Sequence, residues 1–212
     1  SLNMTPDLGL GEVMSLTREE SVSFWKEELK SAVKGMPKGI VQFLWHDYAV
    51  TTGVASGKYS PEMIEETIKE AYLKNYEFVS LEDFMKRFSA ARSNQLRYSW
   101  NDSDKLTVQL SGQDLGQYAI EFSDSYRIGS VSNWFAYDDD TIFVPEAGGV
   151  FQVNFAQTPE QITRISKLPM RLKLQSTAGD GTKLEFTAHG EGIVEISLNT
   201  SVSEKYQVLG TS

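Results

Sequence analysis

Hydrophobic side chains recur at helical spacing in three stretches of the first 94 residues. Each stretch begins at residues typical of helix N-termini, namely Thr17 with Glu20, Ser60 with Pro61, and Ser80. Because side chains three or four positions apart share one face of a helix, we expect one buried face on each helix. The expected buried side chains are Val22, Trp25, Leu29 and Val33; Ile64, Thr67, Ile68, Ala71 and Tyr72; and Phe84, Met85 and Phe88.

Two short apolar runs between these helices are predicted to be strands. Residues 40–46 and 76–79 are rich in β-branched and aromatic side chains, whereas residues 1–17 show no clear period and are predicted to be loop. Alternating helices and strands are typical of α/β folds with parallel strands. Two strands alone cannot bury both faces of a parallel sheet. This segment therefore either packs on the rest of the chain or is the last part of a larger (β/α) barrel, which we favour.

The pattern changes character at about residue 94. From residue 96 onward, apolar and polar residues alternate in eight or nine short runs that are separated by turn residues, among them the hairpin signal Asp180-Gly181. Short strands with regular turns predict an antiparallel β-sandwich. The predicted fold class is therefore α/β plus all-β. An α/β segment forming part of a barrel occupies residues 1–94, and a β-sandwich domain occupies residues 95–212.

Composition and charge narrow the classes of partner. The chain has a formal net charge of −9, a pI of about 4.8 and a mean hydropathy of −0.33. An acidic protein repels phosphate backbones, so we expect no nucleic-acid partner. No apolar run reaches the length of a membrane span, so we expect none. The absence of cysteine excludes disulfides and thiolate chemistry. The start lacks a signal-peptide pattern, and we expect the chain to be part of a longer polypeptide.

One stretch resembles a known family. The run Ile40–Asp47 reads IVQFLWHD, and after a loop and a helix, residues 75–84 read NYEFVSLEDF. This succession resembles the C-terminal end of NodB-like polysaccharide deacetylases of the carbohydrate esterase type. In that family a late barrel strand ends in Leu-x-His, and a later run reads Gly-Tyr-x-Phe-Val-Ser/Thr-Leu-x-Glu. Asn75 stands in place of the glycine, and the resemblance covers about a quarter of the chain.

The resemblance implies a hydrolase that removes N-acetyl groups from a polysaccharide or cell-wall glycan with a divalent metal such as zinc. His46 matches the histidine that protonates the leaving amine, and Leu44 matches a leucine that lines the pocket. Trp45 and Asp47 flank this histidine and are further candidate substrate contacts. The family's Asp-Asp and His-x-x-x-His motifs have no counterpart here. We therefore expect no metal or other cofactor in this chain, and no activity without the rest of the parent polypeptide.

An imidazole suits proton delivery to a poor leaving nitrogen, because it titrates near neutral pH. A buried carboxylate partner would stabilise its charged form. Asp47 is adjacent in sequence, but successive strand side chains point to opposite sides, so we do not expect it to be that partner. The alternative is that His46 is a structural histidine, hydrogen-bonded to backbone at a strand end. The resemblance also implies an extracellular or periplasmic location.

Other residues support a different hypothesis. Trp134 is a candidate substrate contact in the second segment, because an exposed aromatic ring can stack on a sugar, although core packing also explains it. The chain could then be a non-catalytic carbohydrate-binding or cell-surface module, or a structural domain that mediates assembly. We expect His189 at the surface. Asp138–Asp140 form either a solvated turn or part of a calcium site.

Overall fold

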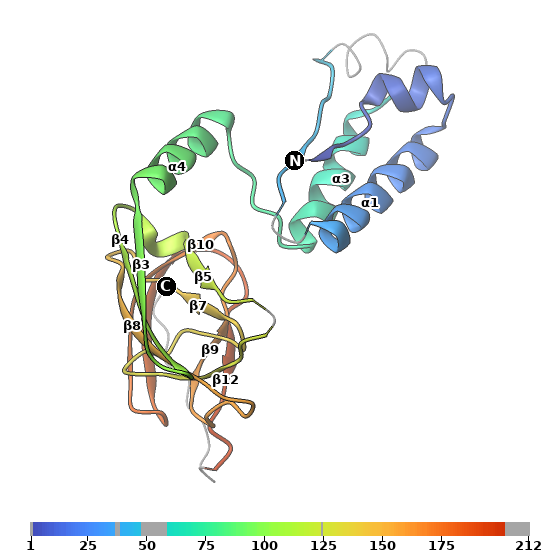
Figure 1. Ribbon diagram of the computed structural model, residues 1–212. Coiled ribbons are helices and arrows are strands. Elements are labelled where there is room, and N and C mark those ends of the chain that lie inside the picture. The colour runs from blue at the N-terminus through green and yellow to red at the C-terminus, as the bar shows by residue number, and fades with distance from the viewer. Residues whose placement is uncertain (1, 37–38, 48–58, 124, 202–212) are drawn as a thin grey trace. The chain divides into compact units, whose positions relative to one another are not determined.

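The chain forms two compact units, which comprise residues 1–76 and residues 77–212 (Figure 1). The computed structural model describes residues 2–36, 39–47, 59–123 and 125–201. Among the described residues, the first unit holds two packed α-helices, a short π-helix and a short parallel sheet, and the second holds an α-helix, a 3₁₀ turn and antiparallel sheets. The chain is therefore an α plus β protein with mostly antiparallel sheets. The finer description, as a partial barrel and a sandwich, stays a prediction.

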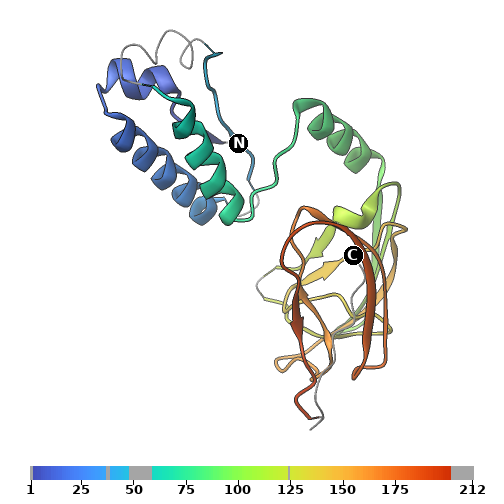
Figure 2. The same ribbon diagram turned by 180° about the vertical axis from the view of Figure 1, so that it is seen from behind.

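Helices α1 (Arg18–Gly35) and α3 (Pro61–Leu73) lie side by side in the first unit, as both views show (Figures 1 and 2). The capping box predicted for α1 is confirmed. Thr17 accepts a hydrogen bond from the backbone of Glu20 at 3.2 Å, and the Glu20 carboxylate accepts one from the backbone of Thr17 at 2.9 Å. Ser60 and Pro61 begin α3 as predicted. The Ser60 side chain makes no capping bond, so a capping box marks the start of α1 and the proline in the first turn marks that of α3.

The parallel sheet of the first unit is much shorter than predicted. Strand β1 (Leu2–Asn3) pairs in parallel with β2 (Val41–Gln42), and a short π-helix, η1 (Gly9–Val13), follows β1. The predicted strand over residues 40–46 is therefore wrong beyond Gln42. The prediction of loop throughout residues 1–17 is wrong as well, as is that of a strand over residues 76–79.

The core of the first unit lies around Trp25, which is fully buried. Phe43 and Trp45 pack on Trp25 with ring centroids at 5.0 and 5.8 Å. Because these rings fill the core, the residues after Gln42 are held by packing rather than by a strand ladder. Helix α3 buries the face that carries Met63, Thr67 and Ala71.

Parts of the expected helix faces are exposed. Val33 of α1 is 39% exposed, and Ile68 and Tyr72 of α3 are 46% and 42% exposed, so their predicted burial is wrong. The buried face of α3 carries Met63, Thr67 and Ala71, and Ile68 and Tyr72 lie on the adjacent, more exposed face.

The second unit is built mainly from antiparallel strands. One sheet has four strands, in the order β3 (Gln95–Asp102), β4 (Lys105–Ser111), β8 (Gly149–Phe155) and β6 (Ile128–Val131). Three further pairs are β5 (Ala119–Glu121) with β7 (Thr141–Phe143), β10 (Leu172–Gly179) with β11 (Leu184–Gly190), and β9 (Arg164–Lys167) with β12 (Glu195–Ser197). A single 3₁₀ turn, η3 (Leu115–Gln117), precedes β5.

Alternation along these strands directs one set of side chains into a common core. Val108 of β4 lies opposite Phe151 of β8, and both belong to the largest buried cluster together with Ile142 of β7. The predicted hairpin at Asp180-Gly181 is confirmed, since it joins β10 to β11 and Gly181 has a φ of +89°. A residue without a β-carbon adopts this conformation at little cost.

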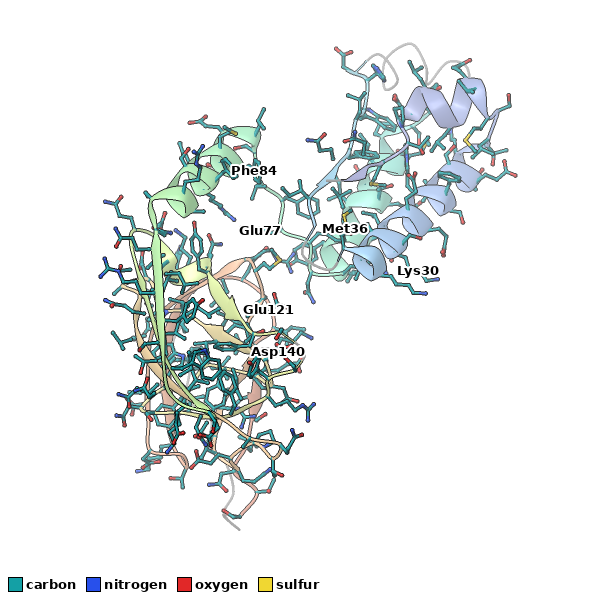
Figure 3. The ribbon with its side chains drawn as sticks, in the orientation of Figure 1. Lys30, Met36, Glu77, Phe84, Glu121 and Asp140 are labelled. Atoms are coloured by element: carbon teal, nitrogen blue, oxygen red, sulfur yellow. The ribbon has the colours of Figure 1, made fainter. Side chains whose placement is uncertain are left out.

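Helix α4 (Leu81–Ser93) belongs to the second unit by its contacts. Arg87 forms two hydrogen bonds with the Glu77 carboxylate at 2.7 and 2.8 Å, and its carbonyl accepts one from the Tyr118 hydroxyl. Figure 3 labels Glu77 before the helix and Phe84 upon it. The sequence placed the domain boundary after residue 94, whereas the compact units divide after residue 76. Met85 and Phe88 are 50% and 51% exposed, so their predicted inward orientation is wrong.

Candidate active site

His46 is held by a buried carboxylate that the sequence analysis did not identify. Its ring nitrogen Nδ1 lies 2.6 Å from Oδ1 of Asp7, and its backbone N–H donates to Oδ2 of the same residue at 3.2 Å. The Asp7 side chain is completely buried, whereas the His46 side chain is 29% exposed. One carboxylate thus fixes both the main chain and the ring of His46, and the ring reaches the surface.

The parallel sheet explains why these two residues meet. Asn3 at the end of β1 pairs with Gln42 at the end of β2. Asp7 lies four positions after Asn3, and His46 lies four positions after Gln42. Because parallel strands end at the same edge of a sheet, the two side chains are brought to one place although they are 39 positions apart in the sequence. The carboxyl edge of a parallel sheet is where reactive groups of α/β proteins gather.

Helix α1 anchors the segment that carries Asp7. The Trp25 indole N–H donates to the carbonyl of Thr5 at 2.7 Å. The backbone N–H and hydroxyl of Thr5 both donate to the Glu28 carboxylate, at 3.0 and 2.7 Å respectively. These bonds tie residue 5 to the helix on two sides. The Asp7 carboxylate is therefore presented from a fixed main chain.

The geometry assigns different roles to the two ring nitrogens. A carboxylate can only accept, so Nδ1 donates its hydrogen to Asp7, and the neutral ring then carries its lone pair on Nε2. The protonated ring carries a hydrogen at both positions and still donates the one on Nδ1 to the carboxylate. A histidine oriented in this way can take up a proton at Nε2 and give it back, as general acid–base catalysis requires. The pair is therefore a candidate proton-transfer site.

The predicted neighbours of His46 differ in their positions. Leu44 is 57% exposed, so it is not part of a buried strand as its apolar run had indicated. Trp45 packs into the core, and its buried indole N–H has no hydrogen-bond acceptor among the described residues. Asp47 is exposed, and the partner of the imidazole is Asp7. The suggested role of all three as substrate contacts stays a prediction.

Trp134 belongs to the second unit. Its indole N–H donates to the carbonyls of Ala136 and Phe143, at 2.9 and 3.2 Å, and the side chain is partly buried. His189 is exposed, as expected, although it lies on β11 rather than in a turn. Both residues therefore belong to the second unit, whereas His46 belongs to the first.

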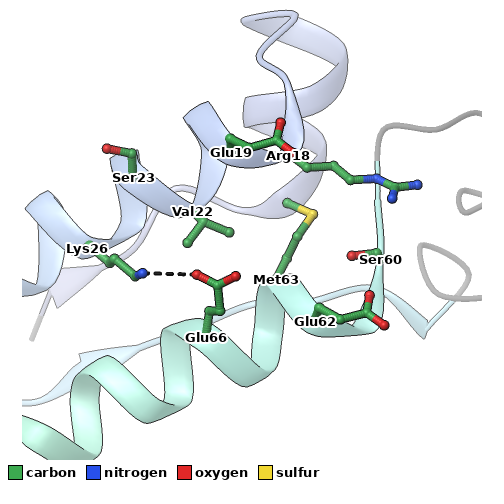
Figure 4. A pocket seen from close by; sticks show the side chains of 9 residues that line it. All are labelled: Arg18, Glu19, Val22, Ser23, Lys26, Ser60, Glu62, Met63 and Glu66. Carbon is green, nitrogen blue, oxygen red and sulfur yellow. Dashed lines mark hydrogen bonds and ion pairs between the residues drawn. The ribbon is translucent and has the colours of Figure 1, made fainter.

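A hollow of about 460 Å³ lies between the first turns of α1 and α3, and His46 does not line it (Figure 4). Lys26 and Glu66 form an ion pair across it at 3.0 Å. Its other charged side chains are Arg18, Glu19 and Glu62. Acidic and basic groups are thus intermixed, and the arrangement favours neither an anion nor a cation.

The metal implied by the resemblance would need several ligating side chains that converge on one point. No three histidine, aspartate or glutamate side chains among the described residues converge as metal ligands, and the sequence has no cysteine. Both carboxylate oxygens of Asp7 already accept hydrogen bonds from His46. This part of the chain therefore does not fit the metal, and no step is assigned through it.

The three aspartates at 138–140 each have partners within the protein. Asp138 Oδ1 accepts hydrogen bonds from the backbone N–H groups of Asp140 and Thr141, at 3.0 and 2.8 Å. Asp140 accepts one from the Thr141 hydroxyl, and Asp139 pairs with Arg127. Burial raises the pKa of the Asp138 carboxyl above its ordinary value. The carboxylate of Asp138 therefore closes a turn before β7, near the labelled Asp140 in Figure 3.

Asp7 left only a weak signal in the sequence. It lies in a glycine- and proline-containing stretch without helical or strand period, 39 positions before His46. The one available signal is the spacing: Asp7 lies four positions after Asn3, and His46 lies four positions after Gln42. That signal requires knowledge of the β1–β2 register, which the sequence does not contain.

Comparisons of the chain with protein-family models, with curated proteins and with solved structures find no match. Within the described residues, no helix combines the length and apolar character needed to cross a bilayer.

Proposed function

We propose that this chain supplies the proton-donating histidine of a polysaccharide deacetylase, and that the metal-binding part of that enzyme lies outside these 212 residues. The observation that carries the proposal is the bond between His46 Nδ1 and the buried carboxylate of Asp7 at 2.6 Å. It gives the histidine singled out by the resemblance the partner that proton delivery needs.

The chemistry assigns one task to this pair. Hydrolysis of an N-acetyl group forms a tetrahedral intermediate by addition of water to the amide carbonyl. The C–N bond then breaks, and the nitrogen leaves readily only as it receives a proton. In the proposal this proton passes from Nε2 of His46 to the departing amine, while Nδ1 keeps its hydrogen and donates it to the Asp7 carboxylate. No residue of this chain is assigned the activation of water.

Three features support the proposal that further elements complete a barrel around the first unit. The β1–β2 sheet has two strands, which is too few to shield a parallel sheet. A large apolar side chain of α3, that of Ile68, is 46% exposed. The buried indole N–H of Trp45 also lacks an acceptor there, and such groups are rare in complete folds. Additional strands and helices would satisfy all three.

The second unit is proposed to be a β-sandwich that accompanies the catalytic part. This is supported by the core cluster, which combines inward residues of the four-stranded sheet with Ile142 of β7 and Ile120 of β5. The proposed substrate is a polysaccharide or cell-wall glycan. By the same resemblance, the proposed location is extracellular or periplasmic.

The test is release of acetate from N-acetylated glycans by the complete encoded protein, with zinc or cobalt added. We expect His46→Ala to lower the turnover by about 10²- to 10⁴-fold, the usual contribution of a positioned acid. The matched control is His189→Ala, which removes the other histidine of the chain and should leave turnover unchanged. Asp7→Asn should retain substrate binding but lower turnover and alter its pH profile.

Two results would refute the proposal. Robust turnover by these 212 residues alone would show that no outside metal-binding part is needed. Full activity of the His46→Ala variant would remove the role of the pair. A simpler observation bears on the same point: the reading frame upstream of residue 1 should encode an Asp-Asp pair and a His-x-x-x-His motif.

A further inference from the structure

A second hollow, of about 360 Å³, opens in the β-rich unit and is lined by residues near Trp134. Two loops form its sides: the turn after β6, with Ser132 to Trp134, and the turn that leads into β8, with Gly148 and Gly149. Gln152 of β8 completes the rim. We call this the Trp134 hollow. It shares no residue with the His46 site.

Trp134 provides the hollow with a rigid aromatic wall. Its indole N–H bonds to two carbonyl oxygens, and Phe151 packs edge-on to its ring at 5.4 Å. The ring contacts two buried clusters and is only partly buried. Both the tilt and the position of the ring are therefore fixed before any ligand arrives, which reduces the entropy cost of binding.

Polar side chains at the rim are available for a ligand. Ser132, Asn133 and Gln152 are exposed, and within the described part of the chain their side chains make no hydrogen bond. Asn133 has a φ of +55°, a left-handed conformation that asparagine tolerates better than most residues. The rim thus offers a hydroxyl and two amides, which together can donate and accept.

The hollow contains no charged side chain, although the chain carries a net charge of −9. An uncharged lining gives no specific attraction for a phosphate, a carboxylate or a metal ion. A neutral ligand that has one apolar face and several hydroxyl groups fits better. Sugar rings have this character, because their C–H face packs on an aromatic ring while amides and hydroxyls bond to their edges.

We propose that the Trp134 hollow binds a neutral pyranose ring of a glycan. The proposal does not depend on the deacetylase function, since it uses only residues of the second unit. If both hold, the second unit retains the polymer whose N-acetyl groups the His46 site acts on. If the first fails, the chain is still a glycan-binding protein.

The test is calorimetric titration of the 212-residue chain with chitotetraose and with cellotetraose, and with tetragalacturonate as an anionic comparison. We expect at least one neutral tetrasaccharide to bind, with an affinity that salt does not change, because no charged side chain lines the hollow. Combining Asn133→Gly with Gln152→Ala should weaken binding at least about tenfold. Both positions are exposed, and glycine keeps the backbone conformation of Asn133 available, so the variant should fold.

The matched control is Trp100→Ala, which removes a tryptophan of β3 that is 45% exposed and does not line the hollow. Binding should survive this change and also His46→Ala. The proposal is overturned if neither neutral tetrasaccharide binds, if the double variant binds as the parent does, or if Trp100→Ala abolishes binding. Stronger binding of tetragalacturonate, weakened by salt, would also contradict it.

Discussion

A buried carboxylate loses its hydration, so Asp7 must recover that free energy from its partners. It does so through two bonds to a single residue, His46, of which one is to the ring and one to the backbone. Each residue depends on the other, because Asp7 positions the imidazole and His46 satisfies the carboxylate. The alternative considered from sequence, a structural histidine, names a backbone partner, and the ring of His46 also bonds to the side chain of Asp7.

Replacement of Asp7 by alanine should destabilise the first unit by about 1–3 kcal/mol. Loss of one partner of a fully buried pair costs more than this, but the His46 side chain is 29% exposed and can turn to water. Hydrogen exchange of α1 amides in the full chain reports this loss locally. The control Glu65→Ala, at an exposed position of α3, should change the free energy of opening by less than about 0.5 kcal/mol. Equal protection in both variants would contradict the expected role of Asp7.

At the scale of single elements, capping and turn chemistry were more predictable than burial. Helices start where expected after Thr17, Ser60 and Ser80, because the signals are local: side-chain caps three positions apart at Thr17 and Ser80, and Pro61 after Ser60. Burial depends on what covers a face. The spacing of Met85 and Phe88 placed them correctly on one face of α4, but it could not show that this face is exposed.

In the second unit, strands could be predicted where apolar and polar residues alternate, and not where they do not. Strands of the second unit alternate, and alternation is visible locally. Strand β9 was missed because its first two residues, Arg164 and Ile165, are both buried and break the alternation. Arg164 is buried with its guanidinium bonded to the carbonyls of Tyr137 and Glu160, which both lie outside the strand. Such a partner cannot be read from the strand itself.

The run that contains Leu44 gives a direct test of burial. Leu44→Ala should cost less than about 1 kcal/mol, since the side chain is 57% exposed. The matched change Leu29→Ala, in a side chain that is 2% exposed, should cost about 2–5 kcal/mol through lost contacts and a cavity. Thermal denaturation of both variants measures the difference. If Leu44→Ala is as damaging as Leu29→Ala, the residues after β2 are more enclosed than described.

The turn closed by Asp138 should respond to pH in a defined direction. Burial raises its pKa in the folded state, so deprotonation opposes folding there. The stabilising effect of the proton is fully present below the ordinary pKa of aspartate and is lost as the pH rises through the raised value. Asp138→Asn keeps an acceptor for the two backbone N–H groups without the charge. Its stability relative to the parent should therefore increase from acidic to neutral pH.

Asp138→Ala serves as the comparison, because it removes the acceptor as well as the charge. It should destabilise the second unit by about 1–3 kcal/mol at neutral pH, leaving two N–H groups without their partner. Urea titrations of the parent and both variants at several pH values measure these effects. A relative stability of Asp138→Asn that falls with rising pH would contradict the sign of the pKa shift.

At the scale of the whole molecule, the α plus β character was predictable from the sequence, but the proton-transfer pair was not. Periodicity identified the helix-rich beginning and the strand-rich remainder. The pair depends on a parallel register of only two residues in each strand, which joins positions 39 apart. Sequence reasoning identified His46 through its flanking motif, and only the folded chain brings Asp7 to it.

The most direct measurement of the central claim is the protonation state of each ring nitrogen of His46. The chain has only two histidines, so long-range ¹H–¹⁵N correlation spectra should resolve both, with exposed His189 as the internal reference. We expect neutral His46 to carry its hydrogen on Nδ1, bonded to Asp7, and to lose this preference in the Asp7→Ala variant. A neutral His46 that carries its hydrogen on Nε2, or a tautomer that does not respond to Asp7→Ala, would contradict the proton-transfer pair and with it the proposed function.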